Sequence, residues 1–287
     1  MCIKIITDSA CDLPKDIIEK LDIELMPILV YVDEQEYKDT VNINPKFLYE
    51  NMKKGSSTKT AQLSIPDLKE VFSKYAKAKQ SCIYIAFSSG LSGTYQTSLL
   101  VKQEILEKYP DFDLDIIDTK CASLGFGLVV YKAAQLAKEG KSKQEILEVL
   151  DFYCNHMEHI FTVDDLEYLF RGGRVSRASA VIGSMLNIKP ILNVEDGKLV
   201  PLEKVRGKKK LLKRMVEIIG ERGVDLDKQL IGICHADDEP NAIKIKELLK
   251  EKYNCNSFLI NLMGCTIGAH SGPGTMSIYF LNEKSPY

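Results

Sequence analysis

The sequence predicts an α/β protein built around a parallel sheet in its first half, followed by a second domain of the α+β class. Three observations lead to this fold class. Short apolar runs alternate with helical patterns through the first half, which is typical of a parallel sheet with crossover helices. The chain has 287 residues, more than one hydrophobic core usually serves. The second half contains a hairpin signal at Asp196 and Gly197 between two apolar runs.

The first half contains the alternating pattern from which we expect an N-terminal three-layer domain over residues 1–159. Asp12 is expected to cap a helix that has Pro14 in its first turn. The segment 125–139 is apolar on nearly every face, so this helix should be buried and could line a cavity. The expected strands are 4–7, 83–87 and 114–118, a further apolar run covers 25–32, and the expected helices are 17–21, 65–78, 95–108, 125–139 and 143–157.

The second half has a different order of predicted strands and helices, and we expect a separate α+β domain over residues 160–287. Its segment 167–174 predicts a helix end broken by two glycines, and 178–186 predicts a helix of small residues. The strands of the predicted hairpin are 188–194 and 198–205. Further expected elements are amphipathic helices at 211–219 and 242–253 and strands at 230–234, 258–263 and 277–281.

The composition is that of an ordinary globular protein. It is 45% hydrophobic and 27% charged with a net charge of −2, which argues against disorder and against nucleic acid as a partner. The N-terminus enters a strand-like run at once, and no run approaches the ~20 apolar residues of a membrane span. The eight cysteines include no Cys-x-x-Cys pair, so we expect buried, reduced thiols. A cytoplasmic protein with at most transient membrane contact is the expectation.

Two segments are candidates for holding an anion: Ser-Ser-Gly-Leu-Ser-Gly-Thr at 88–94 and His-Ser-Gly-Pro-Gly-Thr at 270–275. The first joins a strand to a helix, so its hydroxyls and free amides would point at one place. The second sets an imidazole beside glycines that let backbone approach a ligand. Each also has a structural interpretation, as a strand-to-helix turn capped by Ser92 or Thr94, and as a tight turn around a core histidine. Together they predict a site for a carboxylate or a phosphate.

Other motifs give weaker indications. The stretch 56–62 is expected to be a polar loop, and His156 and His159, despite their i, i+3 spacing, to form a solvated helix end rather than a metal site. No Gly-x-Gly-x-x-Gly or Walker-type loop is present, so no nucleotide cofactor is expected. Seven basic residues between 204 and 214 form either a solvated helix face or a docking patch for an acidic surface.

Taken in order, these segments resemble the DegV family of bacterial proteins over nearly the whole chain. The motifs that carry the resemblance are Asp8-Ser9 with Asp12-Leu13-Pro14, residues 88–94, Asp118-Thr119 with Gly125 and Gly127, residues 171–174, and residues 268–274. Around Thr60 the family pattern is Thr-Ser-Gln-Pro, whereas this chain has Thr-Ala-Gln-Leu, with Ala61 and Leu63 as the departures.

The resemblance implies a lipid-binding protein without catalytic residues, cofactor or metal of its own. In the family a long-chain fatty acid lies in an apolar tunnel between the two domains and is presented to the catalytic subunit of a fatty acid kinase, which forms an acyl phosphate used in phospholipid synthesis. By motif position, Thr60, Ser92 and His270 resemble the residues that hold the carboxylate. The resemblance further implies a supporting site at Gln62, Gly93, Thr94, Arg206 and Gly272, and Lys208, Lys209 and Lys210 are the candidates for docking the kinase.

Two other functions stay open at this point. Ser92 and His270 could be the nucleophile and base of an acyl hydrolase, oriented by Asp8 or Asp118, although the Gly-x-Ser-x-Gly elbow is missing. A binder of a small phosphate ligand could use the same helix N-terminus and would have little use for an apolar tunnel.

Overall fold

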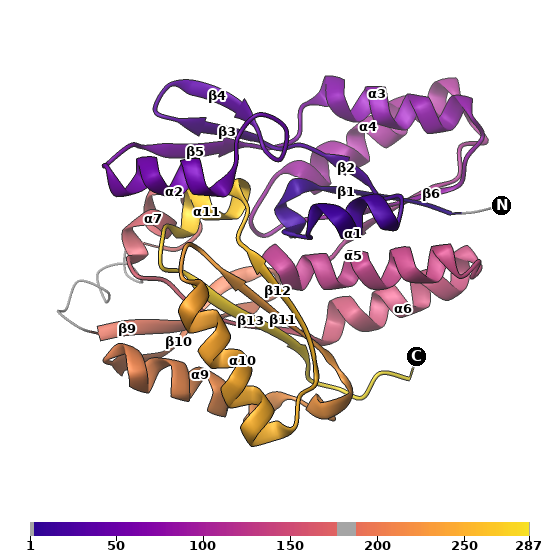
Figure 1. The fold of residues 1–287 in the computed structure, drawn as a ribbon. Coiled ribbons are helices and arrows are strands. Elements are labelled where there is room, and N and C mark those ends of the chain that lie inside the picture. The colour runs from indigo at the N-terminus through magenta and orange to yellow at the C-terminus, as the bar shows by residue number, and fades with distance from the viewer. Residues whose placement is uncertain (1–2, 177–187, 287) are drawn as a thin grey trace.

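The computed structural model describes residues 3–176 and 188–286. The N-terminal half, indigo to magenta in Figure 1, lies above the C-terminal half, orange to yellow, and helix α5 runs between their sheets. The mixed α/β fold class is confirmed. The expected helix at 178–186 lies outside the described residues. Within the described ranges no helix is long and apolar enough to cross a membrane.

The N-terminal half is built on a four-stranded parallel sheet, as the alternating pattern predicts. The strand order is β2-β1-β6-β7, and each neighbouring pair is parallel. Helices α3 and α4 pack against each other on one side of this sheet, and α5 and α6 lie on the other (Figure 1). The strands are β1 (Lys4–Asp8), β2 (Glu24–Met26), β6 (Cys82–Ala86) and β7 (Leu114–Asp118), and the helices are α1 (Lys15–Lys20), α3 (Ile65–Lys77), α4 (Thr94–Lys108), α5 (Ser123–Lys138) and α6 (Lys143–His156).

A small antiparallel sheet, of order β4-β3-β5, extends from this half. The apolar run at 25–32 is therefore not one element. It splits at Pro27 between two sheets, since proline has no N–H for a strand ladder. The predicted polar loop at 56–62 was wrong, because Thr58–Ala61 pairs with β3 along its length. The new elements are β3 (Leu29–Val32), β4 (Gln35–Lys38), β5 (Thr58–Ala61) and helix α2 (Pro45–Lys53).

The C-terminal half contains a six-stranded mixed sheet of order β10-β9-β8-β13-β11-β12. The predicted hairpin is confirmed, since Lys198 pairs with Glu195 on either side of Asp196 and Gly197. Helix α5 packs on one face of the sheet, and α9 and α10 pack on the other. Its elements are β8 (Met157–Thr162), β9 (Ile188–Glu195), β10 (Lys198–Arg206), β11 (Leu230–His235), β12 (Ser257–Leu262), β13 (Met276–Leu281), α7 (Leu166–Arg171), α9 (Lys208–Arg222), α10 (Glu239–Tyr253) and α11 (Cys265–Ser271).

Strand β8 was missed by the sequence analysis. It follows helix α6 without an intervening loop, so the sequence offers no turn signal at residue 157. The prediction that His156 and His159 form a solvated helix end was wrong for the second of them. His159 lies on β8, where it is buried, and its Nε2 accepts from the Ala122 amide at 3.1 Å while its ring also bonds the Met157 carbonyl oxygen.

Asp12 joins the two halves instead of capping a helix, which corrects the sequence prediction. The residue at the start of α1 is Pro14, and Asp12 adopts a left-handed backbone conformation, with φ 51°. Its buried carboxylate accepts from the Gly264 amide at 2.9 Å and from the Ser123 hydroxyl at 2.5 Å. These bonds fix the loop before α11, in the C-terminal half, to the start of α5 and the segment around Asp12 in the N-terminal half.

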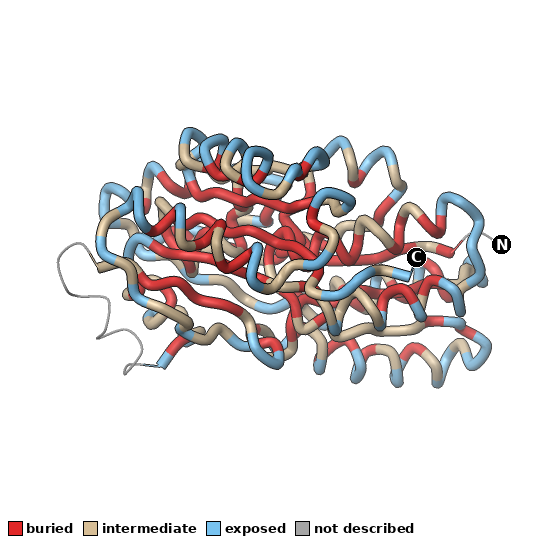
Figure 2. Tube along the Cα trace, turned by 90° about the horizontal axis from the view of Figure 1, so that it is seen from below, coloured by how far each residue is buried: buried red, intermediate tan, exposed pale blue. Residues whose placement is uncertain are grey.

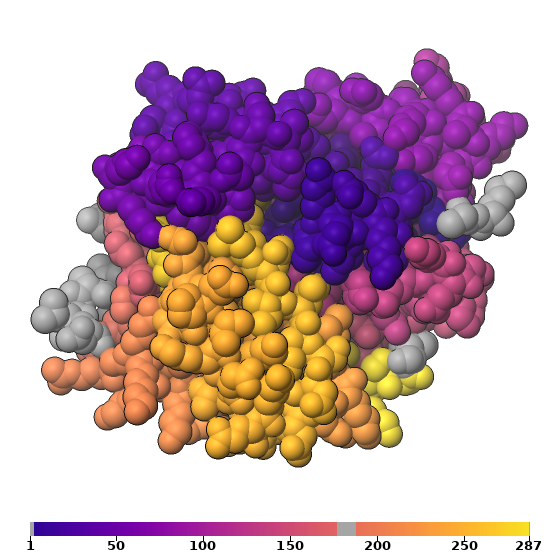
Figure 3. All heavy atoms as spheres, in the orientation of Figure 1, coloured from indigo at the N-terminus to yellow at the C-terminus, as the bar shows by residue number. Residues whose placement is uncertain are grey.

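A second buried carboxylate strengthens the same contact. Asp39 accepts from the Thr266 amide at 3.1 Å and from the Thr266 hydroxyl at 2.5 Å, and the Tyr49 hydroxyl donates to the Met263 carbonyl oxygen. Helix α11 thus packs on α2, on β5 and on the short 3-10 helix Ser9–Cys11 that follows β1. Figure 2 shows buried residues through the middle of the molecule and exposed residues around its rim, and Figure 3 shows the surfaces of the two halves in close contact.

Candidate functional site

A cavity of about 180 Å³ lies between the two halves. Its walls are contributed by β5, the loop after β6, the start of α5, β8 to β10 and α11, so segments far apart in the sequence meet there. Most of the lining is apolar. The apolar residues are Ile28, Ala61, Phe87, Leu91, Ala122, Phe161, Leu169, Val194, Leu199, Met263 and Ile267, joined by Tyr279.

His270 and Thr60 form the first polar group in this cavity. The Thr60 hydroxyl and the His270 Nε2 lie 2.7 Å apart, one on β5 and the other on α11. Burial, with a smaller effect of the nearby Arg174 charge, lowers the pKa of His270 to about 3, so its imidazole is neutral at pH 7. Its Nδ1 is buried without a hydrogen-bond partner among the described residues.

The close approach of Gly172 to His270 explains part of the Arg-Gly-Gly-Arg segment. A Cβ atom at Gly172 would lie 2.2 Å from the His270 Nδ1, which no side chain could tolerate without movement of the ring. The glycine therefore lets the end of α7 pack directly on the imidazole. A nitrogen that is buried without a hydrogen-bond partner costs free energy.

Ser92 and Gly93 lie on the opposite wall, in the turn before α4. The Ser92 hydroxyl donates to the Thr94 hydroxyl at 3.0 Å and also accepts from the Thr94 amide. Thr94 is buried behind them and accepts from the Leu63 amide, and the Gln62 side chain donates to Thr97. The N-cap position of α4 is Gly93, which has no side chain to cap the helix. Ser92, Gly93 and Gln62 line the cavity, whereas Thr94 supports them.

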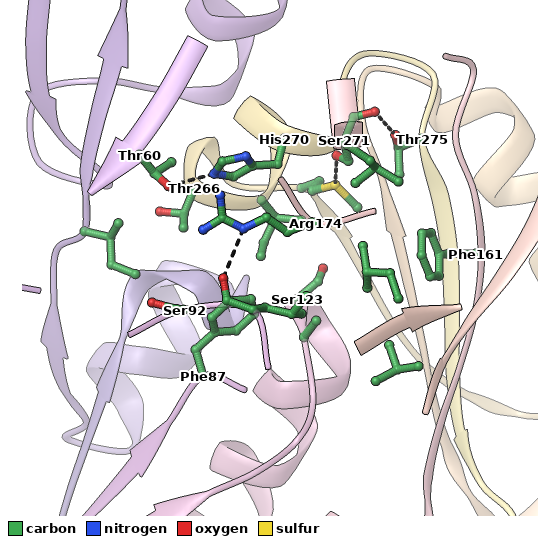
Figure 4. A pocket seen from close by; sticks show the side chains of 18 of the residues that line it. Thr60, Phe87, Ser92, Ser123, Phe161, Arg174, Thr266, His270, Ser271 and Thr275 are labelled. Carbon is green, nitrogen blue, oxygen red and sulfur yellow. Dashed lines mark hydrogen bonds between the residues drawn. The ribbon is translucent and has the colours of Figure 1, made fainter. Parts of the chain in front are cut away.

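Arg174 supplies the positive charge in this cavity, and the sequence analysis did not assign it a role. Its Nε donates to the Leu91 carbonyl oxygen at 3.0 Å and its Nη1 to the Gly172 carbonyl oxygen. The guanidinium is half-buried and makes no ion pair with a described residue. In Figure 4 it lies between the Thr60–His270 pair and Ser92. The signal in the sequence was its place at the end of the Arg-Gly-Gly-Arg motif.

The remaining candidates lie away from this cavity. Gly272 has φ 78°, and a Cβ there would lie 2.3 Å from the Tyr168 ring, so this glycine serves the packing of α11 against α7. Arg206 is exposed at the end of β10, and Lys208, Lys209 and Lys210 are exposed in the first turn of α9. None of these four basic residues is among those that line the cavity.

The described residues do not assemble a hydrolase triad. His270 contacts Thr60 rather than Ser92, and the Ser92 hydroxyl is directed to Thr94. Asp8 accepts from the Ala10 and Phe87 amides, and Asp118 accepts from Ser89, so neither carboxylate orients the imidazole. Among the residues that the structure describes, no group of three or more His, Cys, Asp or Glu could hold a metal ion. The arrangement is suited to holding an anion at one end of an apolar space.

Known proteins similar to this chain belong to one family, and two solved structures among them are described as binding fatty acids. The model of the family described as uncharacterised proteins of the DegV family matches residues 2–283. A DegV domain-containing protein of Clostridium perfringens is 43% identical over 286 residues, 98% of either chain. Among solved structures, one from Thermus thermophilus is described as showing fatty acid binding of a DegV family protein; it has a TM-score of 0.89 and 29% identity, covering 99% of this chain and 100% of its own. Another, from Bacillus subtilis, is described as DegV, a fatty acid binding protein; it has a TM-score of 0.85 and 33% identity with the same coverage.

Proposed function

The chain belongs to the DegV family, and from that premise we propose that residues 1–159 and 160–287 form two domains with a long-chain fatty acid bound in the cavity between them. The bound carboxylate would be presented to the catalytic subunit of a fatty acid kinase, which phosphorylates it to an acyl phosphate for phospholipid synthesis in the cytoplasm. The chain itself is a binding subunit without a catalytic residue.

One observation carries the proposal: a cation and three hydrogen-bonding side chains lie together in a cavity whose lining is mostly apolar. Thr60 and His270 face Ser92 across the guanidinium of Arg174, and most of the remaining wall is aliphatic or aromatic. The other polar side chains of the lining are Gln62, Ser123, His159, Thr266, Ser271 and Thr275. A fatty acid has the same division, with one anionic end and an apolar chain. The two solved relatives from Thermus thermophilus and Bacillus subtilis, both described as binding fatty acid, support the same ligand class.

The tail and the head group have different tasks in this arrangement. Burying ~15 methylenes contributes on the order of 12 kcal/mol before the loss of ligand freedom is subtracted. Each hydrogen bond to the carboxylate adds ~1.5–3 kcal/mol. The tail therefore sets most of the affinity, whereas Thr60, Ser92, His270 and Arg174 set the position and orientation of the carboxylate.

Phosphoryl transfer needs no base from this chain. A fatty acid carboxylate is already ionised at pH 7, so one of its oxygens attacks the terminal phosphorus of ATP directly and ADP departs. The neutral His270 and the cationic Arg174 keep the carboxylate in place without removing a proton. The exposed Arg206 and Lys208–Lys210 would attract an acidic surface of the kinase.

The test is native mass spectrometry of the protein purified from a bacterial host, followed by extraction and identification of any bound lipid. We expect a stoichiometric fatty acid, and a delipidated sample should take up added fatty acid. A folded protein that arrives empty and binds no added fatty acid would contradict the proposed ligand. Formation of acyl phosphate on adding the kinase catalytic subunit and ATP tests the second part.

A further inference from the structure

A second hollow lies on the outer surface, away from the cavity. Helices α9 and α10 pack side by side on the face of the six-stranded sheet that α5 does not cover. Between them runs a groove of about 660 Å³ that is lined by three apolar side chains and flanked by lysine and glutamate side chains. Its floor and wall include Leu212, Leu248 and Ile243, and Ile243 is 42% exposed although it is a large hydrophobic residue.

The two helices run in the same direction, which gives the groove two chemically different ends. Lys208 at the start of α9 pairs with Asp238 at the start of α10, at 2.8 Å. At the other end, a Cβ atom at Gly220 would touch the Tyr253 hydroxyl. The groove thus has Lys208, Lys209 and Lys244 toward its first end and Glu247 and Glu251 further along.

The lysine end has more positive charge than its ion pair between Lys208 and Asp238 neutralises. The first turn of α9 contains lysines and no acidic residue, and its N-cap, Gly207, has no side chain to cap the helix. Cations at the positive end of a helix dipole are unfavourable, since that end attracts anions. Lys209, Lys210 and Lys213 form no ion pair with a described residue. An acidic group placed over this end would be attracted by both the lysines and the helix.

We propose that this groove is the docking site for an amphipathic helix of the kinase catalytic subunit, with acidic residues at one end, apolar residues in the middle and basic residues at the other. Residues 241–251 of α10 line the groove over about 15 Å, the length of a three-turn helix. The acidic end lies over Lys208 and Lys209, and the basic end lies over Glu247 and Glu251. Helix-in-groove recognition combines such apolar anchors with flanking charges. The inference rests on the proposed function, because the partner is the kinase.

The experiment measures the dissociation constant of the kinase catalytic subunit for the fatty-acid-loaded protein by calorimetry. We expect Ile243→Asp to weaken binding at least tenfold and Lys209→Glu to weaken it several-fold. Leu100→Asp is the matched control for the first, because Leu100 is 60% exposed on α4. Lys46→Glu is the control for the second, because Lys46 is also the second residue of a helix, α2. Both controls should bind as tightly as the unchanged protein.

Three results would overturn the inference. Ile243→Asp could bind the kinase as tightly as the unchanged protein, or Leu100→Asp could lose binding equally, or the unchanged protein could fail to bind the kinase. Fatty acid content is measured on every sample by mass spectrometry. If lipid is bound but the kinase is not, the groove and the kinase partner fail while the lipid ligand stands. If no lipid binds, the proposed ligand fails independently of the groove.

Discussion

Arg174 lines the cavity, Asp12 is bonded to Ser123 of the cavity lining, and the two charged groups differ in the partners that they have. Arg174 bonds only to main-chain carbonyl oxygens and forms no ion pair with a described residue. Asp12 is fully buried, and donors from the backbone and from Ser123 occupy both of its carboxylate oxygens. Arg174 can still bind an external anion, whereas the hydrogen bonds of Asp12 already hold the two halves together.

This difference distinguishes a group that binds a ligand from a group that holds the structure together, because the first has no counter-ion among the described residues and the second has donors at both of its oxygens. A half-buried cation without a counter-ion loses hydration, and an anionic ligand can restore the balance. A buried carboxylate with satisfied oxygens and no cation is instead neutralised by a proton. Burial raises the pKa of both Asp8 and Asp12 to about 7. Arg174 is therefore expected to bind the anionic ligand, and Asp12 to bind a proton.

The largest expected effect comes from removing the cation. Arg174→Ala should weaken binding of a long-chain fatty acid about 10- to 100-fold, since hydrogen bonds to charged groups contribute ~1.5–3 kcal/mol. The methyl ester of the same fatty acid has no charge, so the substitution should change its affinity little. Displacement of a fluorescent fatty acid, measured with both competitors, gives the two affinities.

Arg171→Ala is the matched control for that substitution. Arg171 is exposed three residues earlier in the same motif, and it pairs with Glu167 at 3.0 Å on the surface of α7. The control should retain the affinity of the unchanged protein. Equal losses in the two variants, or an equal loss for acid and ester, would mean that Arg174 acts on packing and not on the carboxylate.

The next effect is on stability and follows from the raised pKa of Asp8 and Asp12. In the unfolded chain these groups titrate near 3.8, and in the folded protein near 7, so the folded state binds more protons between those values. Their contribution is therefore fully present below pH ~4 and is lost as the pH rises toward 7, by at most about 1.4 kcal/mol per pH unit for each group. Urea unfolding at pH ~5 and pH ~8 measures this loss.

Asp12→Asn tests the assignment to one side chain. The amide cannot ionise but keeps an oxygen for the Gly264 amide, so the free energy of unfolding should change less between the two pH values. Asp16→Asn on the exposed face of α1 is the control and should keep the slope of the unchanged protein. A slope that is the same in all three proteins would show that Asp12 does not bind the proton.

Local sequence patterns predicted the parallel sheet, the β9–β10 hairpin and most helices, because each has a periodic or turn signal of its own. Elements that depend on distant partners were missed. Strand β5 is polar, and pairing with β3 makes it a strand. Strand β8 follows α6 without a turn, and pairing with β13 defines it. Asp12 looked like a helix cap because its partners, Gly264 and Asn261, lie some 250 positions away in the chain.

The candidate site shows the same limit. Resemblance indicated Thr60, Ser92 and His270, and the structure places all three on the walls of one cavity, while their role with a ligand stays a prediction. Arg174 could not be singled out from the sequence, because Arg171 lies in the same motif and only folding directs one arginine inward and the other to solvent. The tertiary structure decides which of two similar side chains is left without a partner.

The smallest effect expected is that of Thr60→Val, which keeps the shape of the side chain and removes its hydroxyl. The cavity loses one hydrogen-bonding group and His270 loses its 2.7 Å partner, so fatty acid affinity should fall about fivefold, the equivalent of ~1 kcal/mol. Thr58→Val is the control on the same strand, since the Thr58 hydroxyl donates to the Ala269 carbonyl oxygen and does not line the cavity. Both variants remove a bond between β5 and α11, so both should lower the unfolding free energy, but only the first should weaken binding. Equal fatty acid affinities in the two variants would mean that Thr60, like Asp12, holds the halves together and does not bind the carboxylate as Arg174 does.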